Sequence, residues 1–337
     1  MGNGWSDDGD GIRRRDFLKL AGAAGGIMLL NPAGVFAQAK KRISVATGGM
    51  GGVYFVIGGG IATILTKYAG VEAAAEVTAA SVDNCKLLAA KKSDLGLVMG
   101  DTGADAYKGE AMFKGKPLPL RTLTMLYPQA MHVVTSEGTG LKKVADLKGK
   151  RVSTGAPGSG TEVKALRVLE AAGINPDKDI KRDRLGASES AGALKDGKIE
   201  AYFWDGGVPT SSVLDLAASP GIKMMLLPVG DDLVAKMTAK YGPVYYVAPI
   251  PKKVYSGIEY DTPTCWVGNM LMVHKDMDPT LAYNCVKTIF DNLKELQAIH
   301  KEATNITMKT GASEKAVPYH PGAAKFFKEK GFNVPVA

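Results

Sequence analysis

Short apolar segments that alternate with helix-spaced segments constrain the fold of this chain more than any other feature of its sequence. In the first part of the chain, strands are expected at residues 42–47, 73–78 and 95–99, and helices at 53–68 and 83–90. Strands that alternate with helices in this way form βαβ units with parallel strands. The first part of the chain is therefore predicted to be an α/β lobe.

A second set of alternating segments begins near residue 130. The expected strands span residues 131–135, 151–154, 199–204 and 223–227, and the expected helices span 162–172, 192–198 and 210–217. The pattern again predicts βαβ units, so the chain is expected to contain two α/β lobes of similar size.

The last part of the chain is expected to return to the first lobe. A strand at residues 266–274 is followed by one long amphipathic helix at 280–300, which Asp278-Pro279 would start. We therefore expect lobe 1 to comprise residues 40–128 and 248–337, and lobe 2 to comprise residues 129–247. The crossings near Tyr127-Pro128 and Tyr245 to Pro249 would be hinges.

Residues 1–39 have the three parts of a secretory signal. Arg14-Arg15-Asp16-Phe17-Leu18-Lys19 precedes a weakly apolar run over residues 20–30, and Ala37-Gln38-Ala39 provides a cleavage site. The paired arginines favour the twin-arginine route. A membrane anchor is the alternative, but this run is shorter than the ~20 apolar residues that a span needs and contains glycines. The mature protein is therefore expected in the periplasm.

The charge of the chain argues against a nucleic-acid partner. Residues 1–39 contain equal numbers of basic and acidic residues, so residues 40–337 carry the whole net charge of +8. The excess is scattered, with no arginine-rich stripe and no interleaved aromatic residues. It predicts at most a mild attraction for anionic ligands or surfaces.

The cysteines and histidines do not predict a metal site or a cofactor. Cys85, Cys265 and Cys285 have no metal-ligand spacing, and the four histidines are widely separated. One disulfide with one thiol left over is allowed in an oxidising compartment. Small buried apolar side chains are the favoured interpretation.

Three polar or glycine-rich turns open predicted helices at the ends of predicted strands. The first, residues 47–54, has four glycines in five positions, which let a backbone approach a ligand closely. The second contains Ser81 and Asn84, and the third contains Ser159, Gly160 and Thr161. The first lacks the third glycine of a dinucleotide motif, and the third lacks the lysine of a phosphate loop. Helix N-termini at such turns favour a small anion.

Two further residues lie just beyond predicted strands. Asp101 follows the strand at 95–99, and Trp204 ends the strand at 199–204. Ligands of open α/β sheets bind beyond the carboxyl ends of the strands, so both side chains are expected near the same crevice. A helix cap is the alternative for Asp101, and a core position is the alternative for Trp204.

In order and spacing, these segments resemble the TAXI family, the substrate-binding subunits of one class of TRAP transporters. The resemblance covers nearly all of residues 40–337. It is carried by Thr47-Gly48-Gly49 with Gly52 and Tyr54, Ser81 with Asn84, Asp94-Leu95-Gly96 leading to Asp101, Leu126-Tyr127-Pro128, residues 146–152, Gly158-Ser159-Gly160-Thr161, Asp196-Gly197-Lys198-Ile199 and His320-Pro321-Gly322-Ala323.

This resemblance implies a two-lobed α/β fold of the type II periplasmic-binding-protein kind, without a cofactor. Such a protein closes around a small carboxylate, such as glutamate or 2-oxoglutarate, and delivers it to TRAP membrane subunits. We expect it to act as a monomer. The ligand-binding residues that the resemblance implies, with Trp204 nearby, are Thr47, Gly48, Gly49, Tyr54, Ser81, Asn84, Asp101, Ser159, Gly160 and Thr161.

Four positions depart from the family pattern. Met99 stands where Gln is frequent, Gln129 where Glu is common, and Ala80 where Gly is usual, while Asp205 adds an acidic group. These departures bear on which carboxylate is bound. An exported sensor that docks onto a membrane receptor is the alternative function. An exported enzyme is a remote one, because no nucleophile elbow and no paired metal ligands are present.

Overall fold

The computed structural model describes Met1 and residues 40–336. The predicted signal segment at residues 1–39 therefore lies outside the described residues. Residues Lys40–Ala337 form one compact unit. Among the helices of the described residues, none is long and apolar enough to cross a membrane.

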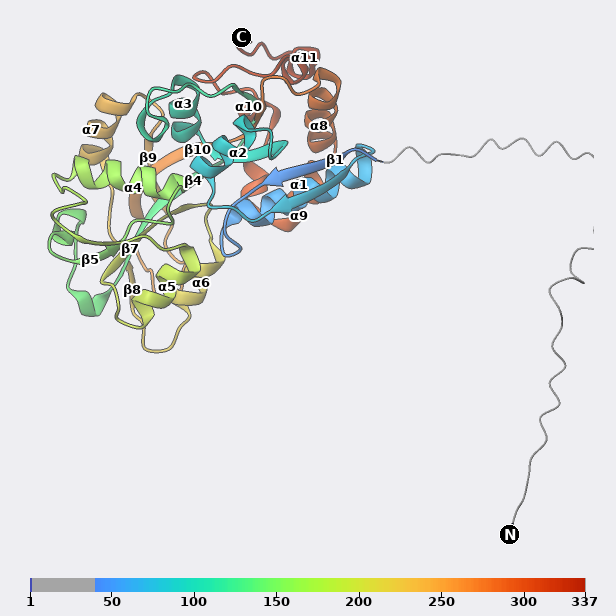
Figure 1. The fold of residues 1–337 in the computed structure, drawn as a ribbon. Coiled ribbons are helices and arrows are strands. Elements are labelled where there is room, and N and C mark those ends of the chain that lie inside the picture. The colour runs from blue at the N-terminus through green and yellow to red at the C-terminus, as the bar shows by residue number, and fades with distance from the viewer. Residues whose placement is uncertain (2–39, 337) are drawn as a thin grey trace, which may run out of the picture. The chain divides into compact units, whose positions relative to one another are not determined.

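Ten strands within residues 40–336 form one continuous mixed sheet (Figure 1). The main path runs β2-β1-β3-β10-β4-β7-β5-β6, with β8 paired to β4 and β9 paired to β10. The strands are β1 (Arg42–Ala46), β2 (Glu72–Glu76), β3 (Leu95–Met99), β4 (Leu120–Ser136), β5 (Arg151–Ser153), β6 (Lys181–Asp183), β7 (Ala201–Gly206), β8 (Met224–Leu226), β9 (Tyr246–Ile250) and β10 (Thr262–His274).

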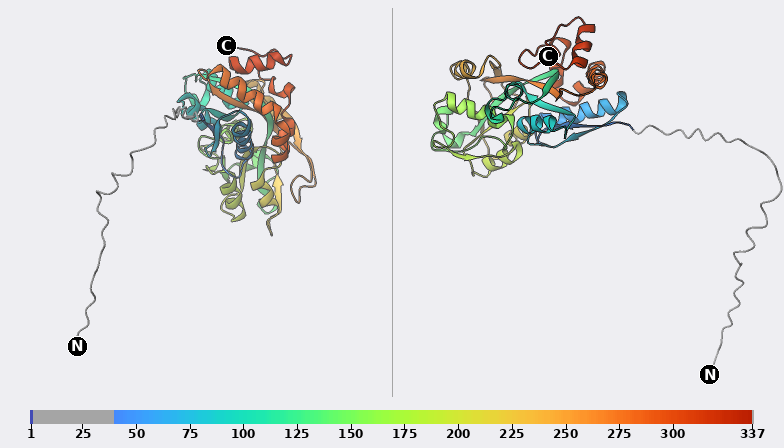
Figure 2. Two further views of the ribbon diagram at one scale, coloured as in Figure 1. Left: turned by 90° about the vertical axis from the view of Figure 1, so that its right-hand side faces the viewer. Right: turned by 45° about the horizontal axis from the view of Figure 1, so that its top comes forward.

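Helices cover the sheet in two groups, which Figures 1 and 2 show from three directions. The blue and red ends of the chain lie together, and the green and yellow middle forms the other group. The helices are α1 (Val53–Tyr68), α2 (Ser81–Ala89), α3 (Gly100–Lys108), α4 (Gly160–Ala171), α5 (Ala187–Lys195), α6 (Ser211–Ala217), α7 (Asp231–Tyr241), α8 (Pro279–Asp291), α9 (Leu293–Ile299), α10 (Met308–Gly311) and α11 (Pro321–Glu329).

Two long antiparallel strands join these groups. In its first half β4 pairs with the end of β10, and in its second half it pairs with β7 and β8. The start of β10 pairs with β9. We call the part built on β1–β3 lobe 1 and the part built on β5–β8 lobe 2. The predicted crossings at 127–128 and 245–249 thus fall within β4 and at β9, and the exact lobe boundaries remain a prediction.

The parallel segments were largely predictable. The helix at 53–68 and the strand at 95–99 are confirmed to the residue, and parallel β1 pairs with both β2 and β3. The helix predicted at 192–198 instead begins at Ala187, and the strand predicted from Trp266 begins at Thr262. The sheet is therefore the expected one, with longer antiparallel connections.

The prediction of one long helix over 280–300 is wrong. The helix breaks at Asn292, whose φ of −120° and ψ of 25° end α8 before α9 begins. The Asn292 side-chain amide donates to the Thr288 carbonyl oxygen at 2.8 Å. An asparagine that bonds the preceding turn competes with the backbone pattern of a helix. The break lets α9 turn onto α1, where Leu296 and Ile299 approach Gly60.

Two adjacent glycines of α1 provide a test of this packing. A Cβ at Gly58 would lie 2.3 Å from Thr47 Cγ2, whereas a Cβ at Gly59 would meet no atom within 4 Å. Gly59→Ala is expected to stabilise the protein by about 0.5–1 kcal/mol, because alanine is the better helix former. Gly58→Ala is expected to destabilise it by about 1–3 kcal/mol through overpacking against β1. Urea unfolding of the two variants measures the difference, and equal effects would contradict this packing of α1 on β1.

Candidate ligand-binding site

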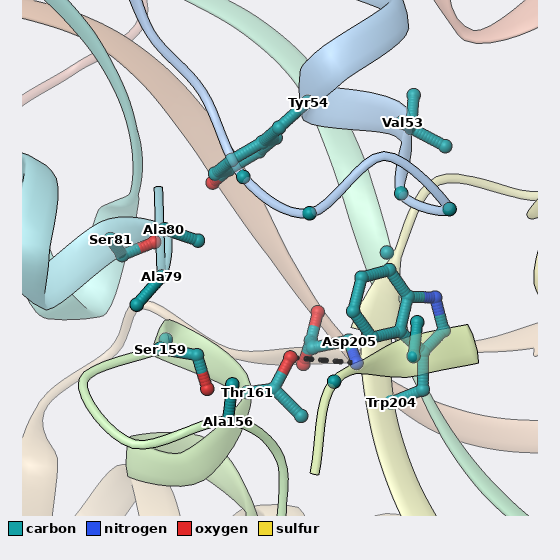
Figure 3. A pocket seen from close by; sticks show the side chains of 18 of the residues that line it. Val53, Tyr54, Ala79, Ala80, Ser81, Ala156, Ser159, Thr161, Trp204 and Asp205 are labelled. Carbon is teal, nitrogen blue, oxygen red and sulfur yellow. Dashed lines mark hydrogen bonds between the residues drawn. The ribbon is translucent and has the colours of Figure 1, made fainter. Parts of the chain in front are cut away.

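A cavity of about 340 Å³ lies between the two lobes (Figure 3). The loop after β1 and the start of α2 form its lobe 1 side, and the starts of α4 and α5 with the end of β7 form its lobe 2 side. Eight of the eleven residues expected from the sequence line it: Gly48, Gly49, Tyr54, Ser81, Ser159, Gly160, Thr161 and Trp204. The three turns singled out in the sequence therefore surround one space.

The glycine-rich loop of lobe 1 lies directly against lobe 2. A Cβ at Gly51 would lie 2.3 Å from Ser188 Oγ, and one at Gly52 would lie 2.9 Å from Trp204 Cη2. The Ser211 hydroxyl donates to the Gly51 carbonyl oxygen at 3.1 Å. A Cβ at either position would force a side chain of lobe 2 to shift, so the glycines favour this close approach of the loop to lobe 2.

The N-terminus of α2 also bridges the lobes. The backbone N–H groups of Val82 and Asp83 donate to the Gly158 carbonyl oxygen at 3.1 and 3.2 Å. The Ser81 hydroxyl accepts a hydrogen bond from the Met99 N–H at 3.1 Å. The first N–H groups of this helix are thus used for contact between lobes, so α2 offers a ligand less than its sequence suggests.

The N-terminus of α4 remains open toward the cavity. Ser159 is its N-cap, and its Oγ accepts from the Glu162 N–H at 3.0 Å. Among the described residues, no acceptor is paired with the N–H groups of Gly160 and Thr161. The positive end of the helix dipole adds to these free donors. This terminus is suited to a carboxylate.

A buried carboxylate holds this turn in place. Glu162 accepts hydrogen bonds from the Gly158 N–H at 3.1 Å and from the guanidinium groups of Arg182 and Arg184. Gly158 itself has a φ of +82°, a conformation that favours glycine. The N-terminal end of α4 is therefore preorganised.

Thr47 and Asn84 lie behind the cavity wall and do not line it. The Asn84 side-chain amide donates to the carbonyl oxygens of Ala46, Thr47 and Leu97 at 3.3, 2.8 and 2.7 Å. The Thr47 hydroxyl donates to the Glu76 carbonyl oxygen at 2.6 Å. Both side chains are fully buried, and they fix the ends of β1 and β3 on which the loop stands.

Asp101 lies at the contact between α3 and α4, away from the cavity lining. It accepts a hydrogen bond from the Tyr245 hydroxyl at 2.7 Å, and its Oδ2 is 3.6 Å from Arg167 Nη1. Arg167 also pairs with Asp105, donates to Tyr245 at 2.7 Å and stacks on the Tyr241 ring. Burial raises the pKa of Asp105 to about 6, although Arg167 opposes this effect. This network joins the two lobes.

The floor of the cavity contains a buried ion pair that the sequence did not predict. Asp205 Oδ2 lies 2.7 Å from Lys164 Nζ, and both side chains have no exposed surface. The Asp205 N–H donates to Thr161 Oγ1 at 3.2 Å, as the dashed line in Figure 3 shows. Burial raises the pKa of Asp205 to about 7, and Lys164 opposes the rise. Asp205 was noted in the sequence, but its lysine partner lies on a different element.

Other lining residues were missed or noted only as departures. Met99 and Gln129, which depart from the TAXI family pattern, both line the cavity. Gly186, Ala187, Ser188 and Glu189 were missed because α5 begins five residues before the predicted helix. The sequence feature that could have indicated these residues is the turn Gly186-Ala187-Ser188, which lies between a strand and a helix of lobe 2.

Metal chemistry finds no support in the described part of the chain. No group of three or more His, Cys, Asp or Glu side chains there is placed to hold a metal ion. The three cysteines are buried and free, which agrees with their interpretation as small apolar side chains.

Comparison with protein families shows to which family this chain belongs. A family model described as the NMT1-like family matches residues 45–331. The chain belongs to the NMT1-like family. The TAXI resemblance is a narrower assignment and remains a proposal.

Three solved structures are similar to this NMT1-like protein. A structure described as a periplasmic transporter has 16% identity and a TM-score of 0.51, covering 86% of this chain and 92% of that chain. A protein from Bordetella bronchiseptica RB50 has 17% identity and a TM-score of 0.50, with 86% and 82% covered. The periplasmic aliphatic sulphonate binding protein SsuA from Escherichia coli has 13% identity and a TM-score of 0.44, with 87% and 91% covered. The fold is the α/β fold of type II periplasmic binding proteins.

The contact between lobes gives this NMT1-like chain a testable weak point. Arg167→Met leaves Asp101 and Asp105 buried without a counter-charge, so we expect the free energy of unfolding to fall by about 3–5 kcal/mol. The loss should be larger at pH 8 than at pH 5, because burial raises the pKa of Asp105 to about 6 and its carboxyl is more ionised at the higher pH. Urea unfolding at the two pH values measures it.

A matched exposed pair is the control for this variant. Lys240→Met breaks the surface pair with Glu170 and should change stability little. An Arg167→Met loss no greater than that of Lys240→Met would show that the network contributes nothing to the folded state.

Ala80 has a backbone conformation that suits glycine. Its φ of 78° and ψ of −145° are costly for a residue with a Cβ. Ala80→Gly is expected to raise stability by about 1 kcal/mol, whereas the neighbouring Ala79→Gly should lower it by about 0.5–1 kcal/mol. Thermal unfolding compares them, and destabilisation by both would exclude strain at Ala80.

Proposed function

We propose that this chain is a periplasmic solute-binding protein that captures a small carboxylate by closure of its lobes. It then delivers the ligand to a TRAP-type membrane transporter. The observation that carries the proposal is the free N-terminus of α4, whose Gly160 and Thr161 N–H groups line a cavity enclosed by both lobes. Backbone donors at the positive end of a helix bind an anionic oxygen without a charged side chain.

The loop after β1 provides the opposing wall. Gly49 leaves its backbone exposed, Gly48 is buried against Ala80 and Tyr54, and the Val53 and Tyr54 N–H groups open α1 beside them. Tyr54 donates to Asn269 Oδ1 at 2.5 Å, which fixes its ring against the cavity. A carboxylate between the two loops would draw lobe 1 and lobe 2 together, as expected for capture by closure.

The volume and lining favour a small ligand. The cavity holds about 340 Å³, and its walls are mainly backbone, small residues and the apolar surfaces of Met50, Met99 and Trp204. The resemblance to the TAXI family supports a dicarboxylate or an acidic amino acid, such as glutamate or 2-oxoglutarate. It also supports TRAP membrane subunits as the partner, a monomer as the working form and export through the twin-arginine route.

A periplasmic sensor would use the same cavity and differ only in its membrane partner. Catalysis is disfavoured because the described cavity wall contains no His or Cys, and the hydroxyls of Ser81 and Ser159 hold backbone N–H groups. Deleting the transporter genes separates the two binding roles. Loss of ligand uptake supports delivery to a transporter, and unchanged uptake with altered ligand response supports a sensor.

Calorimetric titration of the purified protein tests the binding function. We expect at least one of glutamate, 2-oxoglutarate and succinate to bind with a sub-millimolar dissociation constant. Thr161→Val should weaken that binding by about 1.5–3 kcal/mol, because it removes a hydroxyl from the carboxylate site and keeps the side-chain shape. Thr304→Val, at an exposed hydroxyl outside the cavity, should leave the affinity unchanged.

The thermal unfolding midpoint of each variant shows whether its fold is kept. If no small acid binds while a sugar or a cation does, the carboxylate function is wrong. Equal affinity of Thr161→Val and the unchanged protein would remove Thr161 from the site.

A further inference from the structure

Asp205, at the floor of the cavity, can accept more hydrogen bonds than the surrounding protein groups donate to it. Asp205 ends β7 and lines the cavity, and its carboxyl is buried. Its Oδ2 pairs with Lys164 Nζ at 2.7 Å, whereas its Oδ1 accepts no hydrogen bond of normal geometry from the described residues. Lys164 donates another of its three N–H groups to the Cys265 carbonyl oxygen at 2.9 Å. An under-satisfied buried carboxylate is costly, and a ligand donor would reduce that cost.

The charges of the cavity wall favour one kind of ligand group. Among the described residues that line it, the charged side chains are Asp205 and Glu189, and neither Lys nor Arg is present. A ligand carboxylate next to Asp205 would meet an acidic side chain whose cationic partner, Lys164, is already paired with it. An ammonium group would meet its counter-charge there.

The groups around Asp205 do not cancel the preference of the site for an ammonium group. Lys164 of α4 and Gln129 of β4 favour its ionised form, whereas burial and Asp101 of α3 disfavour it. Tyr54 of α1 and Cys265 of β10 face the same carboxyl as neutral groups, since burial raises the pKa of each. Asp205 therefore gains from an additional cationic donor.

The acceptor lies next to the site proposed for the carboxylate. The Asp205 N–H donates to Thr161 Oγ1 at 3.2 Å, so the floor and the N-terminus of α4 are in direct contact. Figure 3 shows the Asp205 carboxyl beside Thr161, on the side facing Tyr54 and Ser81. A carboxylate on α4 places an amino group on its adjacent carbon close to Asp205.

We propose that Asp205 is a specificity-determining residue that accepts the amino group of an α-amino acid. This proposal rests on the proposed function, because it takes the α4 terminus as the carboxylate site. It narrows the ligand class: amino acids bind, and carboxylates of the same skeleton without the amino group bind much more weakly. Lys164 pairs with the Asp205 carboxyl, favours its ionised form and positions it.

Matched ligand pairs test the proposal directly. Glutamate and 2-oxoglutarate differ only at the carbon beside one carboxylate, and leucine and 4-methylpentanoate differ only by the amino group. Calorimetry at pH 8 is expected to show at least tenfold tighter binding of the amino member of any pair that binds. Equal or tighter binding of the member without the amino group overturns this proposal and leaves the carboxylate function standing. Binding of no carboxylate overturns both.

Substitutions assign the preference to Asp205. Asp205→Asn alone leaves Lys164 buried and unpaired, so the fold is protected by the double variant D205N/K164M, which removes both charges. Relative to the unchanged protein, the double variant is expected to bind the ligand with the amino group at least tenfold more weakly. Its affinity for the matched ligand without the amino group should stay within about threefold. Parallel weakening of both members would show a purely structural pair and would overturn the proposal.

The second acidic residue of the wall provides the control. Glu189→Gln should preserve the discrimination between the paired ligands, because Glu189 is exposed and its charge is screened by solvent, unlike that of buried Asp205. Loss of discrimination in Glu189→Gln, with discrimination kept in D205N/K164M, would transfer the role to Glu189 and contradict the assignment.

Discussion

One buried face of helix α4 determines how the two lobes of this protein fit together. Gly160 and Thr161 at its start line the cavity, Lys164 one turn later pairs with Asp205, and Arg167 one turn further pairs with Asp101 and Asp105. Residues three and four apart share one helix face. Because buried cations are stable only beside their counter-charges, these pairs fix α4 against β7 within lobe 2 and against α3 of lobe 1.

The rest of the site follows from that placement. With α4 fixed, its free N–H groups face the glycine-rich loop, and Gly51 and Gly52 allow that loop to lie against Ser188 and Trp204. The N-terminus of α2 gives up its own donors to hold the α4 turn through the Gly158 carbonyl oxygen. Among the described residues, α1 and α4 thereby keep helix ends with free backbone donors at the cavity. Their preorganised backbone donors need little rearrangement to bind an anion.

The sequence predicted the parts of this structure that depend on local pattern. The α/β alternation, the helix at 53–68 and the three turns are local features, and the turns do converge on one cavity. Asn84 and Asp101 look the same in sequence whether they face a ligand or a neighbouring backbone. Their partners lie on other strands and helices: Leu97 for Asn84, and Tyr245 for Asp101. The Lys164–Asp205 pair joins residues 41 positions apart in sequence, and sequence spacing alone gives no sign of it.

A crystal structure of the protein, purified without refolding and soaked with the tightest-binding acid from calorimetry, tests the central claim most directly. That claim is that a small carboxylate is bound between the lobes by helix N-termini. The account predicts ligand density in the cavity, with a carboxylate oxygen within hydrogen-bond distance of the Gly160 and Thr161 N–H groups. A ligand bound elsewhere, or bound with its carboxylate away from α4, would contradict it.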